Sequence, residues 1–322
     1  MLSNSISDAV CQLVNERAIE QCNEFKSVWS GFGALLRLSF TDSTNTIVIK
    51  SIVEPSNVEH PRGWHSQLAS ERKLQSYRVE QAFYHDIAKH LSVKTPKCFG
   101  VLSEGKHQYL ILEDLNQQAF KAIDGTNIDA IKSCLTWLAH FHVEMLASAH
   151  HKAVWPQGSY WHLTTRQAEF DAIEDAKLKK YAIIFDQCLR SCDYQTLIHG
   201  DAKIANFMQT PDKTCAYDFQ YTGTGVGIID VMLLLSSALE SDSLFRYEKT
   251  LLAHYKAAFL SHAEKCKVES REAIIKQWLS LYPIAWADFV RFLSGWSPTH
   301  WKLHDYAFTQ LDIAYTLTCS NI

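Results

Sequence analysis

Residues 197–220 read Leu-Ile-His-Gly-Asp-Ala-Lys-Ile-Ala-Asn-Phe-Met-Gln-Thr-Pro-Asp-Lys-Thr-Cys-Ala-Tyr-Asp-Phe-Gln. Two short apolar runs flank Pro-Asp-Lys, in which proline presets φ and aspartate bonds nearby backbone, as in turns. The pattern therefore predicts a β-hairpin. On such a hairpin Asp201 and Asn206 lie on the loop that enters the first strand, while Asp218 ends the second strand beside them. We expect two carboxylates and one amide to converge there.

The spacing of these groups is typical of phosphoryl-transfer enzymes. His-x-Asp-x-x-x-x-Asn is the catalytic-loop pattern of kinases, in which the aspartate accepts a hydroxyl proton and the asparagine holds a metal. This predicts Asp201 as the base and Asn206 and Asp218 as hard oxygen ligands for Mg²⁺. The alternative is a hairpin whose polar residues only bond backbone. Three simultaneous matches favour the chemical interpretation.

The quoted motif resembles the aminoglycoside phosphotransferase and choline-kinase-like superfamily. The resemblance implies an α+β, protein-kinase-like bilobal fold. Its small antiparallel-sheet, ATP-binding lobe would span residues 1–115, and its larger, mostly helical catalytic and substrate-binding lobe would span residues 116–322. The string 197–230 most resembles the branch that includes ecdysteroid-kinase-like proteins. Gly200 replaces the arginine of protein kinases and no Ala-Pro-Glu follows Asp218, which argues against peptide phosphorylation.

A strand lysine and a helix glutamate form the next candidate pair. Lys50 ends the run Ile-Val-Ile and shares a strand face with apolar residues, so it needs a counter-charge if buried. Glu80 lies within a 3.6-period apolar stripe of the helix expected over residues 70–91. The resemblance implies that Lys50 binds the α- and β-phosphates of ATP and that Glu80 orients it. Alternatively, Lys50 extends to solvent and Glu80 lies at the rim.

Two other stretches are candidates for nucleotide contact. Gly31 and Gly33 precede an alternating strand and would let backbone N–H groups approach phosphates, although an ordinary turn gives the same pattern. The strand 107–115 resembles the family's link between lobes, where backbone groups near Glu113 and Leu115 would bond adenine. A buried strand that ends in two solvent-exposed acidic residues gives the same sequence pattern. The insertion 54–68 is either a cover for the site or a surface loop.

Two polar residues near the motif take supporting roles from the resemblance. Lys203 falls where serine/threonine kinases carry a lysine that reaches the γ-phosphate, and the alternative is a surface lysine. Asp230 resembles the family aspartate that bonds the catalytic-loop backbone, and a helix N-cap is the alternative. His142 lies in an apolar helix, where we expect a core histidine with satisfied hydrogen bonds. At the N-terminus we expect Ser7 or Asp8 to cap a helix that carries apolar residues as far as Ile19.

The C-terminal third is rich in aromatic residues at helical spacing, which ordinarily indicates a core stripe. In the superfamily this region walls the acceptor pocket, so it also supplies substrate-contact candidates, with cation–π contact if the acceptor is a quaternary amine. The candidates are Trp286, Asp288, Arg291, Trp296 and Trp301.

Composition agrees with an ordinary enzyme of 322 residues and net charge −4. No basic stripe is visible, so we expect no nucleic-acid partner. The sequence has no apolar run of about 18 residues and no signal-peptide pattern, so we expect no membrane association and a cytoplasmic location. The nine irregularly spaced cysteines fit reduced thiols.

The sequence thus predicts an enzyme that uses ATP and Mg²⁺ to phosphorylate a hydroxyl group of a small molecule. The alternative is a nucleotide-binding pseudokinase that acts as a regulatory or interaction module. Every polar group that the chemistry requires is present, which favours the enzyme. Neither the acceptor, nor a preference for ATP over GTP, nor the oligomeric state is specified by these motifs.

Overall fold

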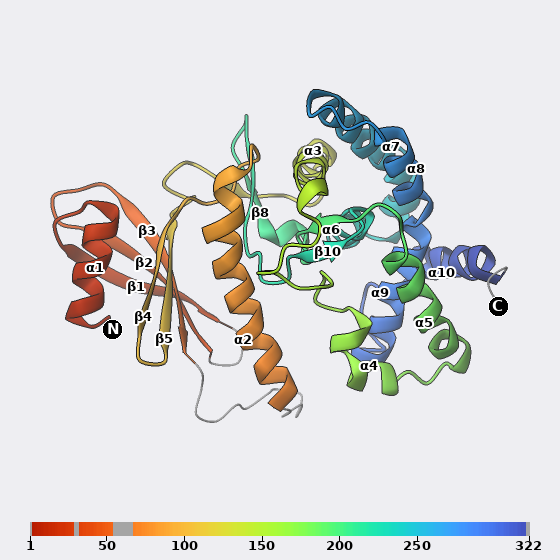
Figure 1. Cartoon of the computed structure of the whole chain (residues 1–322), viewed down its shortest axis with the longest axis horizontal. Helices are drawn as coiled ribbons and strands as arrows, with labels where there is room; N and C mark the ends of the chain where they lie inside the picture. The colour runs from red at the N-terminus through yellow and green to blue at the C-terminus, as the bar shows by residue number, and fades with distance from the viewer. Residues whose placement is uncertain (1, 29–31, 54–66, 320–322) are drawn as a thin grey trace. The chain divides into compact units, whose positions relative to one another are not determined.

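A five-stranded antiparallel sheet forms the centre of the N-terminal part of the computed structural model (Figure 1). Residues 2–28, 32–53 and 67–319 are described. The strand order is β1-β2-β3-β5-β4, and every neighbouring pair is antiparallel. The strands are β1 (Ile19–Val28), β2 (Gly33–Phe40), β3 (Thr46–Val53), β4 (Cys98–Glu104) and β5 (His107–Glu113). β-Branched residues dominate β3, which fits a pleated, half-buried strand.

The chain divides into two compact units. Unit 1 comprises residues 1–90 and 94–121, and unit 2 comprises residues 91–93 and 122–322. Unit 1 holds the sheet, whereas most helices belong to unit 2, which confirms the mixed α+β class expected from the sequence. The predicted functional lobes at 1–115 and 116–322 stay a prediction.

The first helix begins earlier than predicted. Helix α1 covers Asn4–Val14, and its N-cap is Ser3, whose Oγ accepts a hydrogen bond from the Ile6 N–H at 3.2 Å. The predicted caps at Ser7 and Asp8 are therefore wrong, because both residues lie inside the helix. Asn15 adopts the left-handed conformation with φ 57° and ends the helix, so Ile19 belongs to β1.

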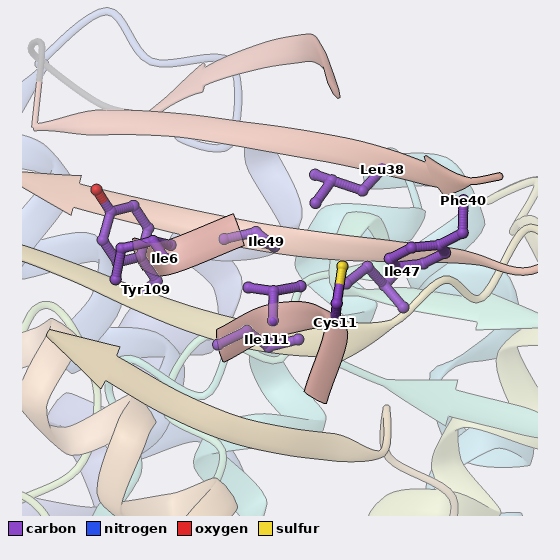
Figure 2. Packing of buried hydrophobic residues seen from close by; sticks show 9 residues of the cluster. Ile6, Cys11, Leu38, Phe40, Ile47, Ile49, Tyr109 and Ile111 are labelled. Carbon is purple, nitrogen blue, oxygen red and sulfur yellow. The ribbon is translucent and has the colours of Figure 1, made fainter. Parts of the chain in front are cut away.

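Different helices pack against the two faces of the sheet. Figure 2 shows α1 residues Ile6 and Cys11 packed with Ile47, Ile49 and neighbouring strand residues on one face. Because side chains alternate along a strand, Lys50 and Ile52 of β3 point to the opposite face. There Ile52 packs with residues of α2 (Gln67–Ala82), and Figure 1 shows the sheet between α1 and α2.

The helix predicted over residues 70–91 changes its winding near the end. After α2, a π-helical turn η2 (Phe83–Ile87) and a 3-10 turn η3 (Ala88–His90) continue the chain. Tyr84 and Ile87 of the predicted apolar stripe remain buried. A π-helical turn is wider than an α-helical one and changes which side chains share a face. A search for a 3.6-residue repeat of apolar residues does not detect such a change.

Unit 2 is built mainly from helices. Helix α3 packs against α7, and α9 packs against α5 and α10. No helix among the described residues combines the length and the apolar character needed to cross a membrane. The helices are α3 (Ile128–Glu144), α4 (Gln167–Asp171), α5 (Ala176–Arg190), α6 (Ile228–Ala238), α7 (Ser241–Lys265), α8 (Arg271–Ser280), α9 (Tyr282–Trp296) and α10 (Asp305–Thr318).

Short strands flank the polar residues of the quoted stretch. The predicted hairpin is confirmed: β8 (Phe207–Gln209) pairs antiparallel with β9 (Thr214–Ala216), and the Thr210 N–H donates to the Lys213 carbonyl across the turn at 2.9 Å. A second pair, β7 (Thr196–Ile198) and β10 (Gly223–Gly225), brackets the stretch. The 3-10 turn η6 (Ile204–Asn206) joins the loop after β7 to the hairpin.

Candidate functional site

The loop after β7 is held in place by one buried carboxylate. Asp230 has no exposed surface, and its two oxygens accept hydrogen bonds from the His199 N–H at 2.6 Å and the Gly200 N–H at 2.9 Å. His142 Nε2 lies 3.1 Å from the same carboxylate, and its Nδ1 lies 2.9 Å from the Tyr255 hydroxyl. His142 is therefore a satisfied core histidine. Asp230 supports the loop backbone, as predicted, and the N-cap of α6 is Gly227 instead.

Gly200 adopts a conformation that other residues rarely take. Its φ is +76°, and a Cβ atom at this position would lie 2.0 Å from the Tyr221 carbonyl oxygen. The loop passes too close to the 221 backbone for any side chain. This close packing accounts for glycine at a position where protein kinases carry arginine.

The Asp201 carboxylate contacts two polar side chains from the next five residues. Its Oδ2 lies 2.8 Å from Lys203 Nζ and accepts from Asn206 Nδ2 at 3.1 Å, while the Asp201 carbonyl also accepts from Asn206 Nδ2 at 2.8 Å. The Asp201 side chain is buried. The structure thus brings together the residues predicted as base, phosphate-binding lysine and metal ligand.

His199 fixes the backbone of Asp201 through its ring. His199 Nε2 lies 3.1 Å from the Tyr217 carbonyl, which only accepts, so Nε2 carries the proton. His199 Nδ1 then accepts from the Asp201 N–H at 3.3 Å. The ring also packs against Phe219, with centroids 4.6 Å apart. This histidine therefore links the loop after β7 to the segment that carries Asp218.

Asp218 follows β9 in a strained conformation with φ 71° and accepts a hydrogen bond from Gln220 Nε2. The neighbouring Tyr217 N–H donates to the Asn206 carbonyl at 3.0 Å, which ties the end of β9 to η6. Left-handed non-glycine residues are uncommon and gather at functional sites.

The donor atoms at this position fit a hard divalent cation. Both contacts of the Asn206 amide nitrogen go to Asp201, so its amide oxygen is the atom left for a ligand among the described residues. An amide oxygen and the Asp218 carboxylate are ligands that Mg²⁺ accepts. Among the same residues no group of three or more His, Cys, Asp or Glu side chains could hold a metal.

The charges around Asp201 favour proton transfer. Burial raises the pKa of Asp201, the Asp218 charge raises it further, and Lys203 opposes both effects. Burial lowers the pKa of Lys203, but the carboxylates of Asp201 and Asp218 raise it on balance. Lys203 is therefore a cation at neutral pH, beside a carboxylate that is more basic than an exposed aspartate.

Unit 1 contains the predicted lysine–glutamate pair. Lys50 Nζ lies 2.6 Å from Glu80 Oε2, and both side chains are buried. The ammonium also lies 5.5 Å from the centroid of the Tyr77 ring. Loss of one partner from a buried ion pair leaves the other charge uncompensated and is strongly destabilising. Glu80 therefore fixes the position of the Lys50 ammonium.

Other nucleotide candidates have structural explanations within unit 1. A Cβ on Gly33, with φ +145°, would lie 1.9 Å from the Ser51 carbonyl, so close strand packing requires glycine there. The Leu115 carbonyl accepts from the Gln118 and Phe120 N–H groups, each at 3.1 Å, and the Glu113 N–H donates to the Lys97 carbonyl at 2.9 Å. Adenine contact at Glu113 and Leu115 stays a prediction. Gly31 and most of the predicted cover, residues 54–66, lie outside the described residues.

The five C-terminal candidates fall into two groups. Trp286 and Arg291 expose no surface, and Asp288 is buried against Arg291 and the Trp161 indole, which is the arrangement of a core stripe. Trp296 is half-buried and stacks on Phe292, with centroids 5.6 Å apart. Trp301 is 56% exposed. Only Trp296 and Trp301 therefore present side-chain surface.

Sequence reasoning missed two residues whose pKa values respond to the charge of Asp201. The Tyr160 N–H donates to the Gly200 carbonyl at 3.2 Å, and burial together with the Asp201 charge raises the pKa of the Tyr160 hydroxyl. Lys302 is buried, and its pKa responds to the charges of Asp201 and Lys203. Tyr160 contacts the loop and Lys302 contacts Ser236 of α6, each from a distant part of the chain. Neither residue belongs to a periodic pattern, so no sequence signal could have identified them.

The model of the phosphotransferase enzyme family matches residues 58–265, which is more than half of the chain. The chain belongs to this family. The resemblance to aminoglycoside phosphotransferases and choline kinases is therefore confirmed, whereas the placement near ecdysteroid-kinase-like proteins stays a prediction. A comparison with curated proteins found no match.

Solved structures of small-molecule kinases share the fold of this phosphotransferase. Choline kinase from Cryptosporidium parvum superposes with a TM-score of 0.57 at 10% identity, covering 99% of this chain and 96% of that chain. Ethanolamine kinase from Plasmodium vivax gives 0.53 at 13%, covering 98% and 87%. Amicoumacin kinase hAmiN, in complex with AMP-PNP, Ca²⁺ and Ami, gives 0.55 at 12%, covering 99% and 94%. At these identities the likeness shows the protein-kinase-like fold alone.

Proposed function

We propose that this phosphotransferase is an ATP-dependent small-molecule kinase that transfers the γ-phosphate to a hydroxyl group. The observation that carries the proposal is the cluster around Asp201, in which Lys203 and Asn206 both contact one carboxylate oxygen. The named relatives act on choline, ethanolamine and amicoumacin, which supports a small acceptor. The AMP-PNP and Ca²⁺ bound to the amicoumacin kinase support nucleotide and divalent-metal use.

Asp201 acts as the base in this proposal. Its carboxylate accepts the proton of the acceptor hydroxyl while that oxygen forms a bond to the γ-phosphorus and the bond from phosphorus to the ADP oxygen breaks. Burial favours this step, because it makes the carboxylate more basic. The Lys203 ammonium, 2.8 Å from the carboxylate, stabilises negative charge on the transferring group.

The remaining groups position the nucleotide. Asn206 and Asp218 would hold Mg²⁺, which neutralises charge on the phosphate oxygens when it is bound. Lys50, oriented by Glu80 at 2.6 Å, binds the α- and β-phosphates. Asp230 and His199 keep the loop fixed, so that Asp201 does not have to reorganise for the reaction.

The proposal is tested by label transfer. Wild-type protein is incubated with γ-labelled Mg-ATP and a low-molecular-weight extract of the source cells, and Asp201→Asn is compared with the control Asp212→Asn, an exposed turn residue of the same hairpin. We expect Asp201→Asn to lower turnover about 10²- to 10⁴-fold, the usual range for loss of a general base.

The outcomes separate the alternatives. Near-normal turnover of Asp201→Asn contradicts its role as base. No labelled product with wild type, while Mg-ATP still binds, favours a nucleotide-binding pseudokinase over the kinase.

A further inference from the structure

A second lysine, Lys302, is linked to the loop of Asp201 through helix α6 and has no part in the proposed transfer. Lys302 belongs to the segment between α9 and α10, and only 8% of its surface is exposed. Its Nζ lies 3.3 Å from Ser236 Oγ of the buried helix α6. The lysine therefore extends inward, toward the helix that also contacts the catalytic loop through Ser237 and Ile204.

The Lys302 ammonium lacks a close counter-charge among the described residues. An ammonium donates three hydrogen bonds, and Ser236 accounts for one of them. The carboxylate whose charge acts on Lys302 is that of Asp201, which is already in contact with Lys203. Burial lowers the pKa of Lys302 to about 8, so the side chain is still mainly protonated at neutral pH. Buried charges in proteins are normally paired.

Aromatic rings connect this ammonium to the surface. Nζ lies 5.3 Å from the centroid of the Phe289 ring and 5.5 Å from that of Trp301. Phe289 is buried, whereas Trp301 is mostly exposed. A molecule that packs on the exposed indole would therefore place a substituent close to Nζ. A quaternary amine packed on this indole would be repelled by the Lys302 ammonium, which lies 5.5 Å from the ring centroid.

We propose that the phosphoryl acceptor carries an anionic group, a carboxylate or a phosphate ester, near its reacting hydroxyl, and that Lys302 binds this group. The inference rests on the proposed kinase function and narrows its substrate class. It also replaces the cation–π role expected for Trp301 with contact to an acidic molecule. A charge-assisted hydrogen bond from a desolvated ammonium is strong and directional, so it selects anionic acceptors over neutral and cationic ones.

The test begins with the charge of the acceptor. A low-molecular-weight extract of the source cells is passed through a strong anion exchanger at pH 7, and the flow-through and the retained fraction are each incubated with wild-type protein and γ-labelled Mg-ATP. We expect labelled product from the retained fraction. Product from the flow-through alone overturns the anionic acceptor and leaves the kinase proposal intact. No transfer with either fraction overturns the kinase proposal, and this inference with it.

The role of Lys302 is tested with the acceptor purified from that fraction. Lys302→Met keeps the length and the apolar contacts of the side chain and should raise the KM for the acceptor about 10- to 100-fold, with a smaller change in kcat. Lys302→Arg, which keeps the charge, should recover part of the loss. The control Lys256→Met, at an exposed position on α7, should match wild type. A wild-type KM for Lys302→Met, or an equal loss for Lys302→Arg, overturns the assignment.

Discussion

At the scale of single residues, Gly200 is a position where the backbone leaves no room for a side chain. An added Cβ would meet both the Tyr221 carbonyl oxygen at 2.0 Å and the Ser159 N atom at 2.7 Å, and the φ of +76° is itself unfavourable for alanine. We expect Gly200→Ala to displace the loop, to cost at least about 2 kcal/mol in the free energy of unfolding and to lower turnover more than about tenfold.

Urea unfolding and label transfer measure the two effects. Gly105→Ala is the matched control, because Gly105 also has a positive φ, +58°, but a Cβ there meets nothing within 4 Å. This control should lose about 1 kcal/mol from backbone strain alone and keep wild-type turnover. Equal effects of the two substitutions would show that strain, and not the clash, accounts for the Gly200 result.

At the scale of elements, a histidine pair joins α3 to α7. The rings of His140 and His262 stack with centroids 4.0 Å apart, and His262 Nε2 lies 3.0 Å from Glu144 Oε1. Burial and the His262 charge lower the pKa of His140 to about 4, although Glu144 opposes the shift. In the unfolded chain the pKa of this histidine returns to 6.5. The folded protein therefore keeps His140 neutral at pH values where the unfolded chain binds a proton.

This difference predicts a loss of stability in acid. Above about pH 6.5 both states are neutral at His140, and as the pH falls toward about 4 the unfolded state gains the proton first. Because the ring is only partly buried, we expect a loss of about 1 to 2 kcal/mol at pH 5. His140→Gln should lose less stability between pH 7.5 and pH 5 than wild type, measured by urea unfolding. His150→Gln, at an exposed position, should retain the wild-type pH dependence.

Element boundaries show where sequence patterns reach their limit. The alternation in 46–52 and the turn chemistry of Pro211 correctly predicted β3 and the β8–β9 hairpin, because both depend on local backbone preferences. The predicted start of α1 was wrong because Ser3, Ser7 and Asp8 are all residue types that cap helices well. The packing of Ile6 on the sheet decides between them. The π-helical turn after α2 likewise depends on packing that has no short-range pattern.

At the scale of the whole molecule, most of the predicted site residues that the structure brings together lie in one stretch of sequence. Asp201, Lys203 and Asn206 lie within six residues, so a loop of any reasonable shape keeps them close. Lys50 and Glu80 lie on different elements, and they were paired by strand alternation, the need for a counter-charge and the resemblance to kinases. Tyr160 contacts the loop, and Lys302 contacts Ser236 of α6, only through tertiary packing, so local sequence patterns identified neither residue.

Binding of Mg-ATP at the proposed nucleotide site should stabilise the folded chain against thermal unfolding. A ligand that binds only the folded state adds about 2.7 kcal/mol at a concentration 100 times its Kd, so Mg-ATP should raise the Tm of wild type. Asp218→Asn weakens the oxygen donor set, and we expect it to abolish the magnesium-dependent part of this rise. The control Asp212→Asn lies in the turn of the same hairpin and should keep the magnesium-dependent rise in Tm.

Thermal unfolding with ATP plus Mg²⁺, and with ATP plus a chelator, separates the metal effect from binding of free ATP. An unchanged Mg²⁺-dependent shift in Asp218→Asn would rule out Asp218 as a metal ligand, and the carboxylate would then act only by raising the pKa of Asp201.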